Sequence, residues 1–101
     1  MKRTRIKPRS KKRLAEVEQR RAVVAAVFHR DWFCCQAKTL VPQIRCWGEL
    51  DAHELLSRGR GGDYLDPENV TTLCRAHHDW CHDHPLEATA VGLLKSAHHH
   101  A

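Results

Sequence analysis

The sequence predicts a small α+β fold, with a long N-terminal helix followed by a short two-stranded hairpin and a second helix. Three observations predict it. Apolar residues recur at helical spacing near the N-terminus, two short strand patterns flank a turn-rich segment, and cysteines and histidines gather on both sides of that hairpin. A chain of 101 residues is the size of one domain. Because so small a chain buries little apolar surface, we expect the fold to be stabilised by metal ligation or disulfides in addition to its core.

The first predicted element is a helix over residues 11–30, with Ser10 able to cap its N-terminus. Its apolar stripe comprises Leu14, Val17, Val24, Val27 and Phe28. The outer face is predicted to carry Arg13, Arg20 and Arg21. Residues 1–9 are basic and contain Pro8, so we expect them to be disordered in the free protein.

The remaining predicted elements are short. In chain order they are a loop or irregular hairpin at 31–47, a strand at 49–56, a turn-rich segment at 57–69, a strand at 70–73, a helix at 75–84, a short helix at 86–95 and an unstructured end at 96–101. The strand at 49–56 is predicted from Leu50, Ala52 and Leu56, which are spaced by even steps. Pro85 ends the helix before it, because proline disfavours helix in the preceding residue.

The charge is unevenly distributed. Residues 1–21, the basic arm, hold ten Lys or Arg against two Glu and carry a net charge of +8, while the remaining eighty residues carry −3. Lys and Arg release counterions from a nucleic-acid backbone, so a basic arm on a mildly acidic body favours a polyanionic partner. A solvated, disordered tail is the alternative.

The N-terminus lacks the apolar segment and cleavage site of a secretory signal, and the longest apolar run, residues 22–28, is too short to span a bilayer. We therefore expect a soluble cytoplasmic protein with no membrane partner. In a reducing compartment the five cysteines are better explained as metal ligands than as disulfides.

A structural zinc site is predicted around Cys74 and His77, whose spacing lets both side chains reach one ion at the start of a helix. Cys46, together with Cys35 or Cys34, can complete a tetrahedral site. Cys81 is an alternative to His77, because it lies on nearly the same helical face.

A second metal site is predicted on another face of the same helix. His78 and His82 are four residues apart, so both imidazoles lie on one side. His53, on the first strand of the hairpin, is the candidate third ligand.

Together these residues resemble the HNH endonucleases, whose site is a hairpin of two strands followed by a helix. The matching residues are His53 and Glu54 in DAHEL, Asn69 in DPENV, and His78 in LCRAHHDW with His82 one turn on. The zinc-bearing branch of that family, common among small phage proteins, is similar in its paired cysteines before the first strand and its Cys-x-x-Cys-His at the helix start. The likeness covers residues 30–86.

The resemblance divides the chain into residues 1–29, a basic arm and helix; residues 30–86, a zinc-stapled nuclease core; and residues 87–101, a short helix and disordered tail. It favours Cys35 over Cys34 as a zinc ligand. Two departures stand out: His77 replaces the second zinc cysteine, which zinc tolerates, and Glu54 replaces the histidine that acts as general base.

The resemblance implies a metal-dependent DNA endonuclease, a phosphodiester hydrolase with His53, Glu54, Asn69 and His78 as its catalytic residues. His53, His78 and His82 would hold one divalent cation, Mg²⁺, Mn²⁺, Ni²⁺ or Zn²⁺, beside the structural Zn²⁺. Asn69 would brace the loop and orient the base, which is Glu54 or, alternatively, His53. Arg58 and Arg60 would contact DNA phosphates together with the helix arginines, although ordinary turn charge explains the two turn arginines equally well.

Two other functions compete with cleavage. One is a noncatalytic zinc-stapled nucleic-acid-binding module that kept the fold and lost the base, for which Glu54 is the main support. The other is an interaction protein beside a phage DNA-packaging machine, located in the host cytoplasm.

Overall fold

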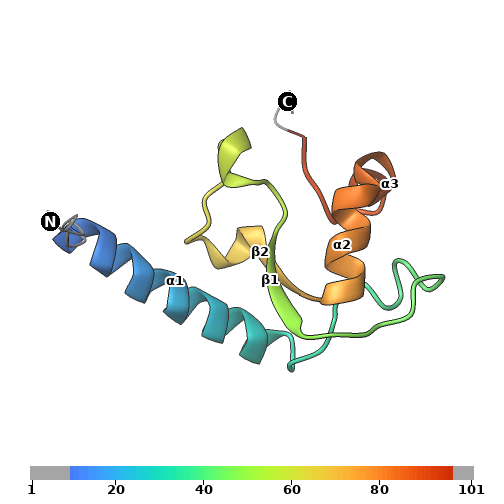
Figure 1. Cartoon of the computed structure of the whole chain (residues 1–101), viewed down its shortest axis with the longest axis horizontal. Coiled ribbons are helices and arrows are strands. Elements are labelled where there is room, and N and C mark those ends of the chain that lie inside the picture. The colour runs from blue at the N-terminus through green and yellow to red at the C-terminus, as the bar shows by residue number, and fades with distance from the viewer. Residues whose placement is uncertain (1–9, 97–101) are drawn as a thin grey trace, which may run out of the picture.

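The computed structural model describes residues 10–96, and its elements follow one another as a long helix, a hairpin and two shorter helices (Figure 1). They are α1 Lys11–Arg30, β1 Leu50–Glu54, β2 Val70–Cys74, α2 Arg75–Asp83 and α3 Pro85–Ala90. Short 3₁₀ turns at Arg58–Arg60 and Pro67–Asn69 lie between the strands. The segment predicted to be disordered at residues 1–9 lies outside the described residues, as do residues 97–101 of the unstructured end predicted at 96–101.

Helix α1 has the bounds that the sequence predicts. The side chain of Ser10 accepts a hydrogen bond from the backbone N–H of Arg13 at 3.2 Å, which satisfies one of the free donors at the helix start. Of the predicted apolar stripe only Val27 is fully buried, and Leu14 remains 49% exposed. The N-terminal half of α1 therefore projects beyond the hairpin (Figure 1).

The last residues of α1 anchor the helix to the hairpin. The Arg30 guanidinium donates to the carbonyls of Pro67 at 2.9 Å and Val70 at 2.8 Å, and it pairs with Asp31. Asp31 in turn accepts the backbone N–H of Thr72. Burial alone would raise the pKa of Asp31, but the hydrogen bonds from Arg30 and Thr72 outweigh it and hold that pKa below its usual value.

The two strands pair antiparallel, in register from Leu50 opposite Cys74 to Glu54 opposite Val70. β1 is shorter than the predicted strand at 49–56, because Leu55 and Leu56 turn their backbone N–H groups toward Asn69 instead of continuing the ladder. In β1 it is His53 that is buried, whereas the residues of the even-spaced pattern are only half-buried.

Helix α2 ends one residue earlier than predicted, and the helix predicted at 86–95 is wrong beyond residue 90. Gly92 takes a left-handed φ of 84°, and Leu93 donates back to the carbonyl of Ala88, which together terminate α3. The chain then returns to the hairpin, where the N–H of Lys95 donates to the carbonyl of Leu55 at 2.7 Å.

The core lies between the loop that precedes β1, the strand β2 and the two C-terminal helices. Its buried members are Cys35, Ala37, Val41, Leu73, Cys74, Ala76, Cys81, Ala88 and Leu93. Alanine and cysteine side chains make up most of this cluster, so the core contains few large apolar side chains. Among the described residues, no helix is both long and apolar enough to cross a bilayer.

Candidate metal centres

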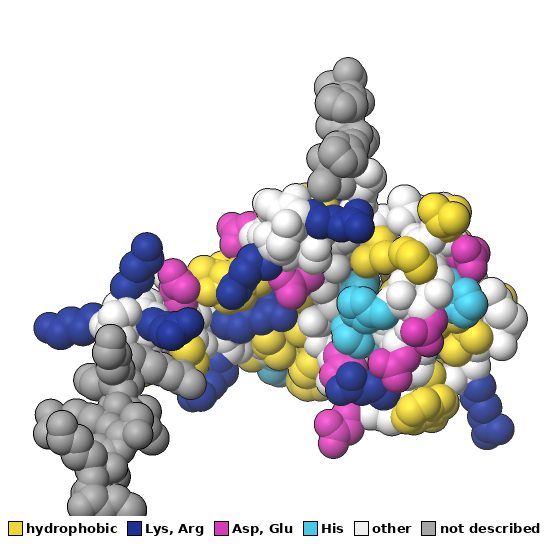
Figure 2. All heavy atoms as spheres, turned by 45° about the horizontal axis from the view of Figure 1, so that its top comes forward, with side chains coloured by type: hydrophobic (Ala, Val, Ile, Leu, Met, Phe, Trp, Pro, Cys, Tyr) yellow, Lys and Arg dark blue, Asp and Glu magenta, His cyan; other side chains and the backbone are white. Residues whose placement is uncertain are grey.

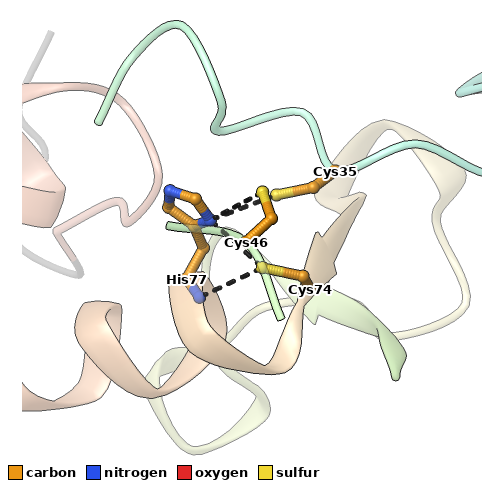
Figure 3. A group of neighbouring side chains, drawn as sticks. All are labelled: Cys35, Cys46, Cys74 and His77. Atoms are coloured by element: carbon orange, nitrogen blue, oxygen red, sulfur yellow. Dashed lines mark hydrogen bonds between the residues drawn. The ribbon is translucent and has the colours of Figure 1, made fainter. Parts of the chain in front are cut away.

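Three cysteines and one histidine converge at the start of α2 (Figure 3). Cys35 and Cys46 come from the loop before β1, Cys74 ends β2, and His77 lies in the first turn of α2. The Nδ1 atom of His77 lies 3.1 Å from the Sγ of Cys74 and 3.5 Å from the Sγ atoms of Cys35 and Cys46. The four donor atoms all lie within 4.8 Å of one another.

These spacings fit a tetrahedral zinc ion. With Zn–S bonds of about 2.3 Å and Zn–N bonds of about 2.0–2.1 Å, the sulfur-to-nitrogen edge of a tetrahedron is about 3.5 Å. The Nε2 atom of His77 lies 3.0 Å from the Val41 carbonyl and donates to it, which leaves the Nδ1 lone pair facing the sulfurs. The donor set and its second hydrogen bond therefore suit a structural metal such as zinc.

The thiols also show why a cation belongs among them. Burial, with the neighbouring sulfurs of Cys74 and Cys35, raises the pKa of Cys46 to about 12. Burial also acts to raise the pKa of Cys74, but hydrogen bonds, led by the one that the backbone N–H of His77 donates, outweigh it and lower that pKa to about 6. One thiolate is thus stabilised and its neighbour is prevented from ionising, a conflict that a divalent cation removes.

The two remaining cysteines lie apart from this Cys₃His cluster. Cys34 is exposed, and its thiol donates to the carbonyl of Trp32 at 3.2 Å. Cys81 is buried in the core, where burial raises its pKa to about 11. Of the open alternatives in the sequence, the structure brings together Cys35 rather than Cys34, and His77 rather than Cys81.

A second cluster comprises His53 of β1 with His78 and His82 of α2. The Nε2 atoms of His78 and His82 are 3.3 Å apart, and the three candidate ligand atoms lie within 4.8 Å of one another. Two nitrogens on one tetrahedral ion, at about 2.0–2.1 Å each, would be about 3.3 Å apart. Figure 2 shows histidine side chains gathered on the surface of the body, with Asp and Glu side chains beside them.

The protonation of this three-histidine cluster favours a cation. Burial lowers the pKa of His53 to about 4, and the Leu93 carbonyl, which accepts from its Nε2, only partly opposes that shift. Burial and the neighbouring His82 lower the pKa of His78. Both imidazoles are therefore neutral near pH 7, the form that binds metals. Because Nε2 of His53 is committed to Leu93, its Nδ1 is the free ligand atom.

Asp51 is a member of this site that the sequence interpretation missed. Its Oδ2 lies 3.9 Å from the Nδ1 of His78, and neither atom has a hydrogen-bond partner in the described part of the chain. Its other oxygen pairs with Arg75 at 3.2 Å. A carboxylate behind a ligating histidine typically orients the ring and raises its basicity. Strand alternation could have revealed it, because residues 51 and 53 point to the same side of β1.

Asn69 holds the loop between the strands. Its Oδ1 accepts the N–H of Leu56, and its Nδ2 donates to the carbonyls of Leu56 and Asp63. These bonds connect the two ends of the loop, whereas the influence of Asn69 on a base stays a prediction. Glu54 is not part of the three-histidine cluster: it follows His53 in the strand and so points to the other side of β1. Its Oε1 is buried and finds no hydrogen-bond partner within residues 10–96. Its role as base stays a prediction.

The predicted DNA-binding arginines differ in their surroundings. Arg13 and Arg21 are exposed along α1, and Arg60 is exposed in its turn. Arg58 is exposed and stacks on Tyr64, with its guanidinium carbon 3.6 Å from the ring centroid. The outer-face prediction is wrong for Arg20, which points inward and donates to the carbonyls of Tyr64 and Ala52. A guanidinium satisfies those carbonyls where the loop backbone crosses the helix.

Comparisons with known proteins give no family for this chain. No family model matches it, and neither a curated protein nor a solved structure is significantly similar to it. The structure itself contributes a small α+β fold, a Cys₃His cluster that could hold zinc and a second cluster of three histidines. Those two clusters are therefore the basis for assigning a function.

Proposed function

We propose that this protein is a metal-dependent DNA endonuclease of the HNH type, folded around a structural zinc ion at the Cys₃His cluster. The observation that carries the proposal is the three-histidine cluster. Three nitrogen donors from a hairpin and a following helix converge within 4.8 Å, and the cluster extends from the buried His53 to the exposed His82. A purely structural site needs no exposed ligand, whereas His82 is exposed and open to a substrate.

The difference in ligand number between the two clusters supports catalysis at the three-histidine cluster. The Cys₃His cluster has four donors and is largely buried, so a zinc ion there has its coordination complete. The three-histidine cluster leaves coordination positions open. A divalent cation bound there would supply Lewis-acid stabilisation of the negative charge on the departing oxygen.

The chain's own residues would perform the other steps. In the proposed hydrolysis a water oxygen bonds to phosphorus as the bond from phosphorus to the 3′ oxygen breaks, and a general base takes the proton of that water. Glu54 is our candidate base, because its buried Oε1 has no hydrogen-bond partner within residues 10–96. His53 is the alternative base, because it lies in the cluster whereas Glu54 points to the other side of β1. Asp51 would orient His78 if its Oδ2, now 3.9 Å from Nδ1, came within hydrogen-bond distance of that atom. Asn69 holds the loop through its three backbone hydrogen bonds.

DNA would be recruited by the basic arm. Figure 2 shows Lys and Arg side chains spread along α1, away from the histidines. With Arg13 and Arg21 exposed there and Arg60 near the cluster, positive charge extends from the arm toward the site. Such a distribution would steer a polyanion without fixing a sequence preference.

The test is cleavage of supercoiled plasmid by zinc-loaded protein, with added Mg²⁺, Mn²⁺, Ni²⁺ or Zn²⁺ and with no added cation. We expect conversion to open-circular or linear DNA that depends on the added metal. His78→Ala should abolish it, because that ring is in the cluster. His84→Ala is the matched control, since His84 lies just after α2 and pairs with Glu87 outside the cluster.

Two results would count against the proposal. Metal-dependent cleavage by His78→Ala at the rate of the natural protein would show that the three-histidine cluster does not carry the activity. Tight DNA binding without cleavage in any metal would favour the noncatalytic zinc-stapled binding module instead.

A further inference from the structure

A pocket lies beside the three-histidine cluster, between the loop after β1, the end of α2, helix α3 and the returning C-terminal segment. Its volume is about 320 Å³. The residues that matter for its chemistry are Leu55, Arg60, His82, Thr89, Leu94 and Lys95. The pocket exists because the backbone of Lys95 is bonded to Leu55, which brings the C-terminal segment against the loop.

The polar side of this pocket is positively charged. Arg60 and Lys95 both line it and both are exposed, and no carboxylate lines it. Within residues 10–96, neither cation forms an ion pair. Lys95 also lines a neighbouring cavity with Asp63, Asp66 and Glu68. Two cations that line one small cavity without an ion pair attract an anion with several acceptor oxygens, such as a phosphate.

The other side of the pocket is apolar. Leu55, Leu94 and Pro85 line it, and Thr89 contributes a short side chain from α3. An apolar wall opposite two cations suits a ligand that has one hydrocarbon face and one anionic end. A deoxyribose bearing a phosphate is such a ligand. A volume of about 320 Å³ stands near the lower end of the range for ligand pockets, about 300–1,000 Å³, which fits one such unit rather than a duplex segment.

His82 belongs both to this pocket and to the three-histidine cluster. A ligand in the pocket is therefore a direct neighbour of whatever the cluster holds. In a DNA strand, consecutive phosphates are joined through one sugar, so a strand can engage both places at once.

We propose that this pocket binds the sugar–phosphate unit of the DNA strand that adjoins the phosphate at the three-histidine cluster. Arg60 and Lys95 contact its phosphate, and Leu55 and Leu94 pack against its deoxyribose. The inference rests on the proposed function and adds to it a substrate subsite, with Lys95 as a binding residue. The pocket places the cut relative to the strand by holding a neighbouring unit.

The experiment measures DNA affinity by fluorescence anisotropy, using the full zinc-loaded chain and labelled duplex DNA with no added divalent cation. Arg60→Ala and Lys95→Ala should each weaken binding roughly tenfold, the size expected for a lost charged hydrogen bond. Each should also reduce the slope of log affinity against log salt by about one. Thr89→Trp should weaken binding with no change of charge, because it fills the cavity. Lys38→Ala is the matched control, a loss of the same charge from an exposed lysine in the loop before β1.

Two results would overturn the subsite. One is a Thr89→Trp variant that binds DNA as tightly as the natural protein does. The other is a loss of DNA affinity in Lys38→Ala equal to that in Lys95→Ala, which would mean only general charge attraction. Amide chemical shifts of the unaltered protein give a measure independent of variant folding: titration with a short duplex should move Leu55, Thr89 and Leu94, and unmoved signals would reject the pocket. Because DNA affinity is measured without a catalytic cation, a result that rejects the subsite can be told apart from a result that rejects plasmid cleavage.

Discussion

Replacing Cys35 with serine should detach zinc from the protein, whereas replacing its neighbour Cys34 should not. The two residues are adjacent in sequence, but only the Sγ of Cys35 lies in the cluster, 3.5 Å from the Nδ1 of His77. Cys34 is exposed and bonds only to a nearby carbonyl. The pair therefore isolates the ligand role from any general effect of losing a thiol.

The expected size follows from the donor set. Structural zinc contributes about 10–16 kcal/mol in small zinc domains, so one of four ligands sharing it equally contributes about 3 kcal/mol. That corresponds to roughly a hundredfold loss of zinc affinity for Cys35→Ser. Complete removal of zinc should unfold the chain, because a protein of 101 residues is stable by only about 5–15 kcal/mol.

The assay is competition with a chromogenic zinc chelator, followed by circular dichroism of the same samples. Cys35→Ser should release zinc at a chelator concentration that leaves Cys34→Ser and the natural protein loaded, and its helical signal should fall with the metal. Equal zinc retention by both variants, or a folded and cooperative protein after zinc removal, would refute the reasoning. Cys81→Ser provides a further check, since a buried cysteine outside the cluster should lower stability without releasing zinc.

Three other predictions follow from the second cluster and its supports. Glu54→Gln should lower single-turnover cleavage by about 10²–10⁴-fold with DNA binding unchanged, and normal cleavage would remove Glu54 as the base. The pKa of His53 is about 6.5 in the unfolded chain and about 4 in the folded one. Between those pH values the unfolded chain therefore binds one more proton than the folded chain. The free energy of unfolding should drop by about 3 kcal/mol as the pH falls through that window. Urea unfolding at pH 7 and pH 5 checks this, because about 2 kcal/mol of the drop falls between those two pH values, and His53→Gln should show less of it. Asn69→Ala should cost about 2 kcal/mol in urea unfolding, because three part-buried loop groups lose their partner, and a loss under 1 kcal/mol would contradict the bracing role.

A fifth prediction concerns the first nine residues of the basic arm. Deletion of residues 1–9, which lie outside the described part of the chain, should weaken DNA binding and flatten its salt dependence, since five Lys or Arg are lost. An unchanged slope in the anisotropy measurement would show that this segment does not contact DNA.

Elements whose signals are local were predictable. The Ser10 cap and the apolar spacing fixed the bounds of α1, and the strand patterns placed the hairpin within a residue or two at β2. The Cys-x-x-His pair and the i, i+4 histidines converge because a single helix positions each pair. In each case the interacting residues are close in sequence, so periodicity carries the geometry.

Features that depend on contacts between distant segments were not predictable. Arg20 points inward because the loop carbonyl of Tyr64 crosses α1, a contact over 44 positions that no spacing encodes. Spacing alone leaves Cys34 and Cys35 open as zinc ligands, because the choice depends on how the loop before β1 folds against α2; only the resemblance favoured Cys35. The pocket at Lys95 forms only because Gly92 ends α3 early and returns the chain to Leu55.

The hydrogen bond from the Nε2 of His53 to the carbonyl of Leu93 has a consequence for folding during synthesis. The two residues are forty positions apart, so His53 leaves the ribosome well before the group that sets its tautomer. During synthesis the nascent hairpin can form while its histidine remains free to flip. A chain that ends before Leu93 would carry the three histidines without this hydrogen bond, so the ring of His53 would not be held in one orientation.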